Sequence, residues 1–230
     1  MFRIYPARHS KECGTYDPRE RPWYKAAVPS TISNTVKPRH VVILMDTSRS
    51  MSDFISDNSN QTKIEYMKEV VGLTLGLLSD KDTVSVIRFG EAAKVVGRLG
   101  ALPPHLWQAA SKNYVNRLIQ DVNAIEVMGR SNWMKGFDFA FDLIDNSLEK
   151  IIASDSDRCK IENIALLFFS DGGMNLPLGI TDAEVVEFFS SRVKSIESKG
   201  DFHLHPFLYT LGNDDPFQVA KQISCSSQGY

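Results

Sequence analysis

Apolar runs of strand length alternate with amphipathic stretches along this chain from about residue 40 onward. The runs at residues 40–45, 83–89, 93–97, 161–169 and 202–211 are typical of β-strands. The stretches at 63–78, 106–122, 133–148, 182–198 and 214–223 carry apolar residues at helical spacing. This alternation predicts an α/β fold, a doubly wound and mostly parallel sheet with helices on both faces.

The first part of the chain has a different character. Residues 1–38 contain five of the ten prolines and little periodicity, and they end in a linker-like stretch at 29–35. We therefore predict two units, a partial segment with its linker over residues 1–38 and a globular domain over 39–230. We also expect both ends of the sequence to be cut from a longer chain.

Composition excludes several classes of partner. The chain has 26 basic and 28 acidic residues, a formal charge of -2, and no basic stripe, so we expect no nucleic-acid partner. It has no apolar run of the roughly 20 residues that a membrane span needs. Three cysteines, at positions 13, 159 and 225, allow one disulfide with one thiol left over.

Oxygen-bearing side chains follow two of the predicted strands. The apolar run 41–45 leads directly into Asp46, Ser48 and Ser50, and the run ending at Phe169 leads into Asp171. In a parallel sheet, ligands bind outside the carboxyl ends of the strands, where the strand order reverses. We therefore expect these side chains to meet in one crevice, joined by Ser131 from the start of a helix.

Two carboxylates and three hydroxyls are hard oxygen ligands of the kind that hold Mg²⁺, Mn²⁺ or Ca²⁺. Asp46, Ser48, Ser50, Ser131 and Asp171 are thus predicted to surround one divalent cation. Two negative charges among neutral ligands leave the charge of the ion under-neutralised and one coordination position open. A carboxylate from a partner would complete its coordination. The alternative is that the same residues only cap helices and loops.

The order of these motifs resembles the von Willebrand factor type A domain over residues 39–230. Asp46-Thr47-Ser48-Arg49-Ser50 is similar to its metal-ion-dependent adhesion site, and Ser170-Asp171-Gly172-Gly173 to its later aspartate loop. Ser131 stands where that family has threonine, which keeps the hydroxyl oxygen. Arg49 stands where glycine is common; turned inward, its charge would lower metal affinity, and we expect it to point outward.

The segment Tyr16-Asp17-Pro18-Arg19-Glu20-Arg21-Pro22-Trp23-Tyr24 resembles the ligand-binding stretch of an amino-acid-sensing double Cache domain. The resemblance implies that Arg21 and Trp23 hold the carboxylate of an amino acid, and that Tyr16 and Tyr24 shape the pocket. Guanidinium suits bidentate carboxylate binding, and aromatic rings exclude water. Simple aromatic packing in a loop is the alternative.

A Cache motif followed by a type A domain resembles the arrangement in the alpha-2-delta auxiliary subunit family of voltage-gated calcium channels. The resemblance implies an extracellular, membrane-associated glycoprotein whose partner is a membrane protein such as the pore-forming channel subunit. It also implies a Cys159–Cys225 disulfide. The stretch 51–62 departs from the family as an insertion, and it carries a possible glycan at Asn60, beside the partner-binding face.

Three other functions compete with this interpretation. The chain has no G-x-S-x-G elbow, phosphate loop or obvious catalytic base, so we expect no enzyme. His203 and His205 share one face of a strand and could bind zinc, but a third ligand is not apparent. A cell-surface adhesion protein, or an amino-acid sensor without a channel, remains open.

Overall fold

The computed structural model describes residues 2–5, 39–56, 59–97, 108–153, 163–172, 180–200, 202–211 and 218–226. Its strands are β1 (Phe2–Tyr5), β2 (His40–Asp46), β3 (Thr83–Phe89), β4 (Lys94–Val95), β5 (Gln108–Ala109), β6 (Asn163–Ser170) and β7 (His203–Leu211). Its helices are the 3₁₀ helix η3 (Arg49–Ser52), α2 (Lys63–Gly76), α3 (Lys112–Asn123), α4 (Trp133–Ala153), α5 (Asp182–Glu197) and α6 (Gln218–Ser226).

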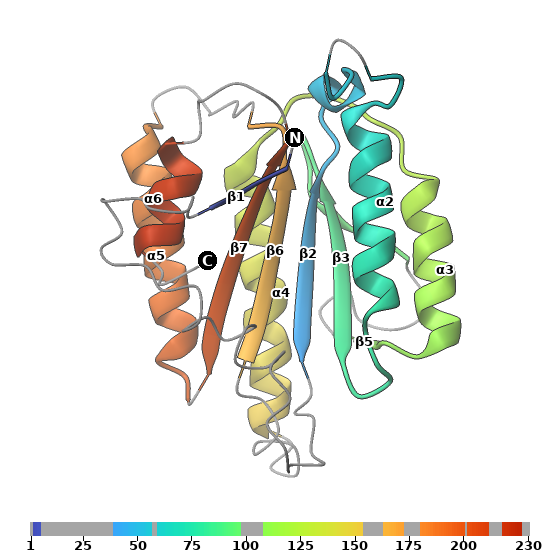
Figure 1. The fold of residues 1–230 in the computed structure, drawn as a ribbon. Helices are drawn as coiled ribbons and strands as arrows, with labels where there is room; N and C mark the ends of the chain where they lie inside the picture. The colour runs from blue at the N-terminus through green and yellow to red at the C-terminus, as the bar shows by residue number, and fades with distance from the viewer. Residues whose placement is uncertain are drawn as a thin grey trace, which may run out of the picture.

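One sheet of seven strands forms the centre of the domain (Figure 1). Its order is β1-β7-β6-β2-β3-β4, with β5 also pairing with β3. The four long strands run parallel, whereas β1, β4 and β5 pair antiparallel at the edges. The chain moves from β2 to β3 on one side and later returns to β6 on the other, so the strand order reverses beside the carboxyl end of β2.

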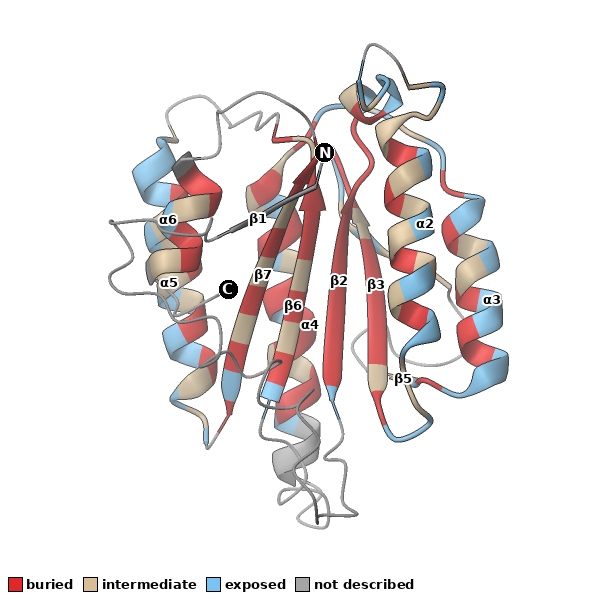
Figure 2. Ribbon diagram, in the orientation of Figure 1, coloured by how far each residue is buried: buried red, intermediate tan, exposed pale blue. Residues whose placement is uncertain are grey.

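Helices cover both faces of this sheet, as predicted, and each face has its own apolar core. Val42 and Leu44 point into the core under α4, α5 and α6, whereas Val41, Ile43 and Met45 point into the core under α2 and α3. Every residue of β2 is buried, which its unbroken apolar sequence required (Figure 2). The centre of the sheet is therefore rigid below the loop that begins at Asp46.

Polar caps set where several helices begin. Thr62 and Thr181 each form a reciprocal capping box, with Glu65 and Glu184 respectively, and these boxes start α2 and α5. The Ser111 hydroxyl accepts a hydrogen bond from the Tyr114 amide and starts α3.

The predicted helix over 106–122 was placed too early. Residues 108–109 form β5, which pairs with the amino end of β3, and the helix begins only after the Ser111 cap. The predicted strand at 93–97 shortens to two residues, and α6 is described only from Gln218. Phe2–Tyr5 adds to the sheet edge as β1, although residues 1–38 gave no strand signal.

Candidate metal centre

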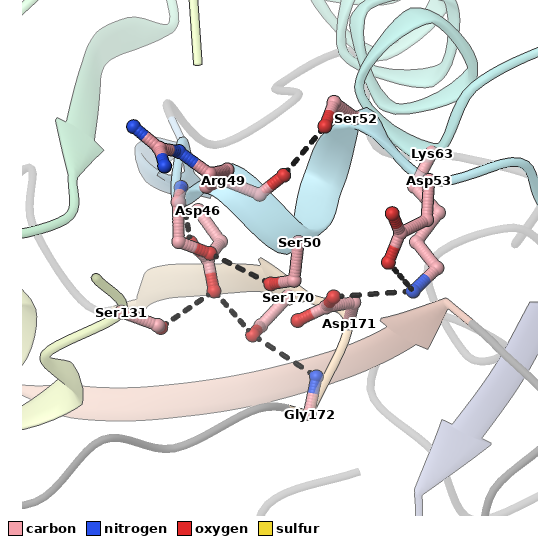
Figure 3. Close-up of polar contacts among 11 residues, drawn as sticks. Asp46, Arg49, Ser50, Ser52, Asp53, Lys63, Ser131, Ser170, Asp171 and Gly172 are labelled. Atoms are coloured by element: carbon pink, nitrogen blue, oxygen red, sulfur yellow. Dashed lines mark hydrogen bonds and ion pairs between the residues drawn. The ribbon is translucent and has the colours of Figure 1, made fainter. Parts of the chain in front are cut away.

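Asp46 lies at the centre of a polar cluster above the carboxyl ends of β2 and β6 (Figure 3). Its side chain is fully buried and accepts three hydrogen bonds. The Ser48 amide donates to Oδ1 at 2.8 Å, and the hydroxyls of Ser131 and Ser170 donate to Oδ2 at 2.7 and 2.6 Å. One carboxylate therefore draws together three segments that are far apart in sequence.

These hydrogen bonds decide how the hydroxyls present themselves. A serine hydroxyl has one hydrogen and two lone pairs. Because Ser131 and Ser170 give their hydrogens to Asp46, the lone pairs of both oxygens remain as acceptors, and Ser170 uses one for the Gly172 amide at 3.2 Å. The hydroxyls of Ser48 and Ser50 lie 3.2 Å apart.

Burial and hydrogen bonding act oppositely on the Asp46 carboxyl. Removal from water raises its pKa, because the charged form loses solvation. Hydrogen bonds from Ser170, Ser48 and Ser131 favour the charged form and offset part of this rise. A cation above the cluster would favour the charged carboxylate further.

Backbone contacts place Ser131 beside Asp46. The amide of Met128 donates to the carbonyl of Thr47 at 2.7 Å, and the amide of Arg49 donates to the carbonyl of Gly129 at 3.0 Å. Gly129 has a φ of 70°, a conformation that side chains other than glycine seldom adopt. The loop after β2 and the loop before α4 are thus joined along their backbones.

An aromatic layer supports the same loop from below. Trp133, the first residue of α4, meets Phe168 edge-on at 4.8 Å, and Phe168 stacks on Phe89 at 5.3 Å. A Cβ on Gly136 would lie 2.9 Å from the Phe89 ring, so only glycine allows α4 to approach so closely. This packing fixes the start of α4 two residues beyond Ser131.

Asp171 follows Ser170 and belongs to the same cluster, but a lysine reaches it. The Lys63 ammonium, from the first residue of α2, lies 3.2 Å from Asp171 Oδ2 and 3.9 Å from Asp53 Oδ2. Lys63 was not predicted to lie in the site, and Ser170 was predicted only as part of the motif around Asp171, not as a group that bonds to Asp46. The Ser170 position at a strand end was a usable signal, whereas nothing local in the sequence places Lys63 there.

Arg49 does not contact the carboxylates of the cluster in the described residues. It is exposed, and Figure 3 shows its guanidinium on the side away from Asp171. It lines a pocket of about 370 Å³ with Ser48, Ser50 and Ser131, and Arg130 and Glu91 also border this pocket. The arrangement agrees with the outward orientation that we predicted.

The five predicted ligands suit a hard divalent cation, since all offer oxygen and four are held by one hydrogen-bonded framework. The described residues contain no group of three or more histidine, cysteine, aspartate or glutamate side chains placed to hold a metal ion. The candidate centre itself has only two carboxylates, those of Asp46 and Asp171. Hydroxyls would supply the remaining ligands.

The other predicted sites are described only in part. Tyr16, Arg21, Trp23, Tyr24 and Cys159 lie outside the described residues. Cys225 is disulfide-bonded, and its pairing with Cys159 stays a prediction. Asn60 is exposed in the loop above α2.

The histidine pair gains no third metal ligand among the described residues, since no such group is found there. His205 Nε2 instead lies 2.9 Å from Asn163 Oδ1. Among the described helices, none combines the length and apolar content that a bilayer span requires.

Comparison with known proteins gives consistent results. A profile of the von Willebrand factor type A domain matches residues 41–173. The chain is 31% identical over 177 residues to the human voltage-dependent calcium channel subunit alpha-2/delta-2, and equally to the mouse protein. This match covers 75% of the chain but only 13% of each relative. The type A domain of SpRpn10 shares the fold, with a TM-score of 0.50 at 12% identity over 83% of this chain and 82% of that one.

Proposed function

Because the chain belongs to the von Willebrand factor type A domain family, we propose that it is a metal-dependent protein-binding module of an alpha-2/delta-like calcium channel subunit. In this proposal one divalent cation, Mg²⁺ or Ca²⁺, is held by oxygens of Asp46, Ser48, Ser50, Ser131 and Asp171. An aspartate or glutamate of the partner supplies the last ligand.

The observation that carries the proposal is the orientation of the hydroxyls around Asp46. Ser131 and Ser170 give their hydrogens to this buried carboxylate. The Ser131 oxygen therefore offers electron pairs rather than a hydrogen to a metal ion, whereas Ser170 uses one of its lone pairs for the Gly172 amide. A purely structural cap would instead point the serine oxygen at a backbone amide of the following helix. Ser48 is bound to Asp46 through its amide and makes no side-chain cap. At the start of α4 the amide of Lys135 donates to the side chain of Asn132, the residue after Ser131.

Charges around the neighbouring pocket suit an acidic partner. Arg49 and Arg130 are exposed on its border, and Glu91 is the acidic residue among its lining residues. Two guanidinium groups favour the approach of a carboxylate and accelerate encounter at low salt. The metal would then anchor the carboxylate, and the arginines would orient the surface around it.

Similarity to the alpha-2/delta-2 subunits supports a partner of one kind, the pore-forming subunit of a voltage-dependent calcium channel. The module would act at the extracellular face of the membrane, where the exposed Asn60 can carry a glycan. It would bind without catalysing a reaction. A glycan at Asn60, above α2, would limit the direction from which the partner approaches.

Thermal unfolding with chelator, Mg²⁺ and Ca²⁺ tests the metal site. An ion at 100 times its dissociation constant adds about 2.7 kcal/mol to the stability of a folded state that alone binds it. For a domain of this size we expect the Tm to rise by about 5–10 °C. Asp46→Asn should abolish the rise. Asp80→Asn should preserve it, because Asp80 is exposed and lies near the amino end of β3, away from the metal centre.

Co-precipitation of the full-length protein with a channel pore-forming subunit tests the partner. Recovery should need Mg²⁺ or Ca²⁺ and should be lost with chelator or in Asp46→Asn. Equal recovery with chelator would refute metal-dependent binding. A metal-dependent Tm rise without recovery of the channel subunit would leave the metal site standing and refute the channel as partner.

A further inference from the structure

The ammonium of Lys63 lies beside the candidate metal centre. Lys63 Nζ lies 3.2 Å from Asp171 Oδ2, and the two side chains are only 16% and 4% exposed. An ammonium at this depth is costly unless it is paired. The pair therefore fixes the lysine close to one of the two carboxylates that a metal ion would need.

The local fold holds Lys63 at a helix position that is unfavourable for a positive charge. It is the first residue of α2, where the helix dipole disfavours a positive charge. The Thr62 capping box starts the helix, and the Lys63 amide donates to the Asp53 carbonyl at 2.9 Å. Because the backbone is anchored on both sides, the lysine side chain can reach Asp171 across the loop.

We propose that Lys63 is a tethered counter-cation that competes with the divalent ion for Asp171. This inference rests on the proposed metal site and adds a residue that sets its affinity. A divalent ion bound by Asp171 and the ammonium would repel each other at a separation of a few Å, so both cannot hold this carboxylate at full strength. Loading the site requires the lysine to leave.

Asp53 offers the place to which the lysine can move. Its Oδ2 lies 3.9 Å from Lys63 Nζ, and its side chain is 69% exposed. A rotation of the lysine side chain exchanges Asp171 for Asp53 without moving the helix. The site thus has two states, one with Lys63 on Asp171 and one with metal on Asp171 and Lys63 on Asp53.

Calorimetric titration with Mg²⁺ and with Ca²⁺ tests the competition in four variants beside the wild type. Lys63→Gln should bind metal about tenfold more tightly than wild type, because Asp171 is no longer neutralised. Asp53→Asn should bind about threefold more weakly, because the lysine loses its alternative partner. Lys63→Arg keeps the charge and should stay within about threefold of wild type. Lys112→Gln should stay within about twofold, since Lys112 is the exposed first residue of α3, beside the amino end of β3 and away from Asp171.

A second readout follows the lysine itself. Mass-spectrometric measurement of amine acetylation should show Lys63 modified faster with Mg²⁺ than with chelator, because the metal releases it towards exposed Asp53. Circular dichroism in chelator checks that each variant is folded. If Lys63→Gln unfolds, Asp53→Asn still tests the competition, because Asp53 is exposed and its substitution leaves the core intact.

The outcomes separate this inference from the proposed function. Wild-type binding that Lys63→Gln does not tighten, or that Asp53→Asn does not weaken, would overturn the competition while leaving the metal site in place. Absence of binding in every variant, including Lys63→Gln, would overturn both. Tight binding in Lys63→Gln that Asp46→Asn removes would support both.

Discussion

At the residue scale, Ser170 links the two carboxylate loops. Its hydroxyl donates to Asp46 and accepts from the Gly172 amide, and the residue is fully buried. Ser170→Ala should cost about 1–3 kcal/mol of unfolding free energy, because a buried carboxylate and a buried amide each lose a partner. It should also reduce the metal-dependent rise in Tm, since Asp46 is held less firmly.

Ser147→Ala is the matched control for this prediction. Ser147 is also a buried serine, but its hydroxyl donates to the Leu143 carbonyl one turn earlier in α4. Urea unfolding in chelator should show a loss below about 1 kcal/mol for it. Equal losses in the two variants would mean that Ser170 only fills space.

The closeness of the candidate ligands could be predicted from the sequence, because they lie at or just after the ends of apolar strand runs or shortly before a helix. Parallel strand ends meet at one edge of the sheet, so Asp46 and Asp171 had to come close. Lys63 could not be predicted, because its pairing with Asp171 spans 108 positions and depends on a side-chain rotamer. Arg49 is the cation that the sequence places beside the motif, but its side chain points away from Asp171 (Figure 3).

At the element scale, the start of α4 depends on the aromatic layer beneath it. Trp133 is 1% exposed and contacts Phe137 and Phe168, so Trp133→Ala should cost about 3–5 kcal/mol. Trp133→Phe should cost clearly less, because no acceptor among the described residues bonds the indole N–H. Thermal scans with and without Mg²⁺ should show a smaller metal-dependent rise in Tm for Trp133→Ala only. Only this variant removes the ring that holds the start of α4, and with it the loop that carries Ser131. An unreduced rise in Trp133→Ala would show that the metal site does not depend on this packing.

Long elements were predictable from their periodicity, whereas the short edge strands β1 and β5 were not. The expected strand at 83–89 and the start of the helix at residue 63 agree with β3 and α2. Strands β1 and β5 have only 4 and 2 residues, too few for periodicity to distinguish strand from loop, whereas β4 lies within the strand predicted at 93–97. Their formation depends on open edges of β7 and β3, which exist only once the sheet has assembled.

At the scale of the whole molecule, the candidate metal ligands and the charged groups that affect stability lie at opposite ends of the strands. The candidate metal centre lies at the carboxyl ends of the strands, and an ionic cluster around buried Asp82 lies at the amino ends of β2 and β3. Asp82 accepts hydrogen bonds there from Arg39 and from Ser79. Burial alone would raise the pKa of Asp82, but these hydrogen bonds outweigh it and hold the pKa far below its usual range.

His40 in the same cluster makes stability depend on pH. Burial lowers its pKa from 6.5 to about 4, and the nearby charge of Asp82 opposes this shift only in part. The unfolded chain therefore binds this proton first as pH falls below 6.5, so stability decreases between about pH 6.5 and 4 by up to about 3 kcal/mol. Asp82 adds a second loss below its unfolded value of 3.8, because its folded pKa is depressed.

Urea unfolding at pH 7 and pH 4.5, in chelator, measures the first of these losses. His40→Leu should lose markedly less stability than wild type between the two pH values, because it has no imidazole to protonate. His205, whose pKa burial also lowers, contributes to both proteins and cancels in the comparison. An equal loss in the two proteins would assign the acid sensitivity to groups other than His40. A smaller loss in His40→Leu would assign the acid sensitivity to His40, which lies at the amino end of β2, at the opposite end of the strand from the metal centre. A drop in metal binding at acid pH could then be measured separately from unfolding.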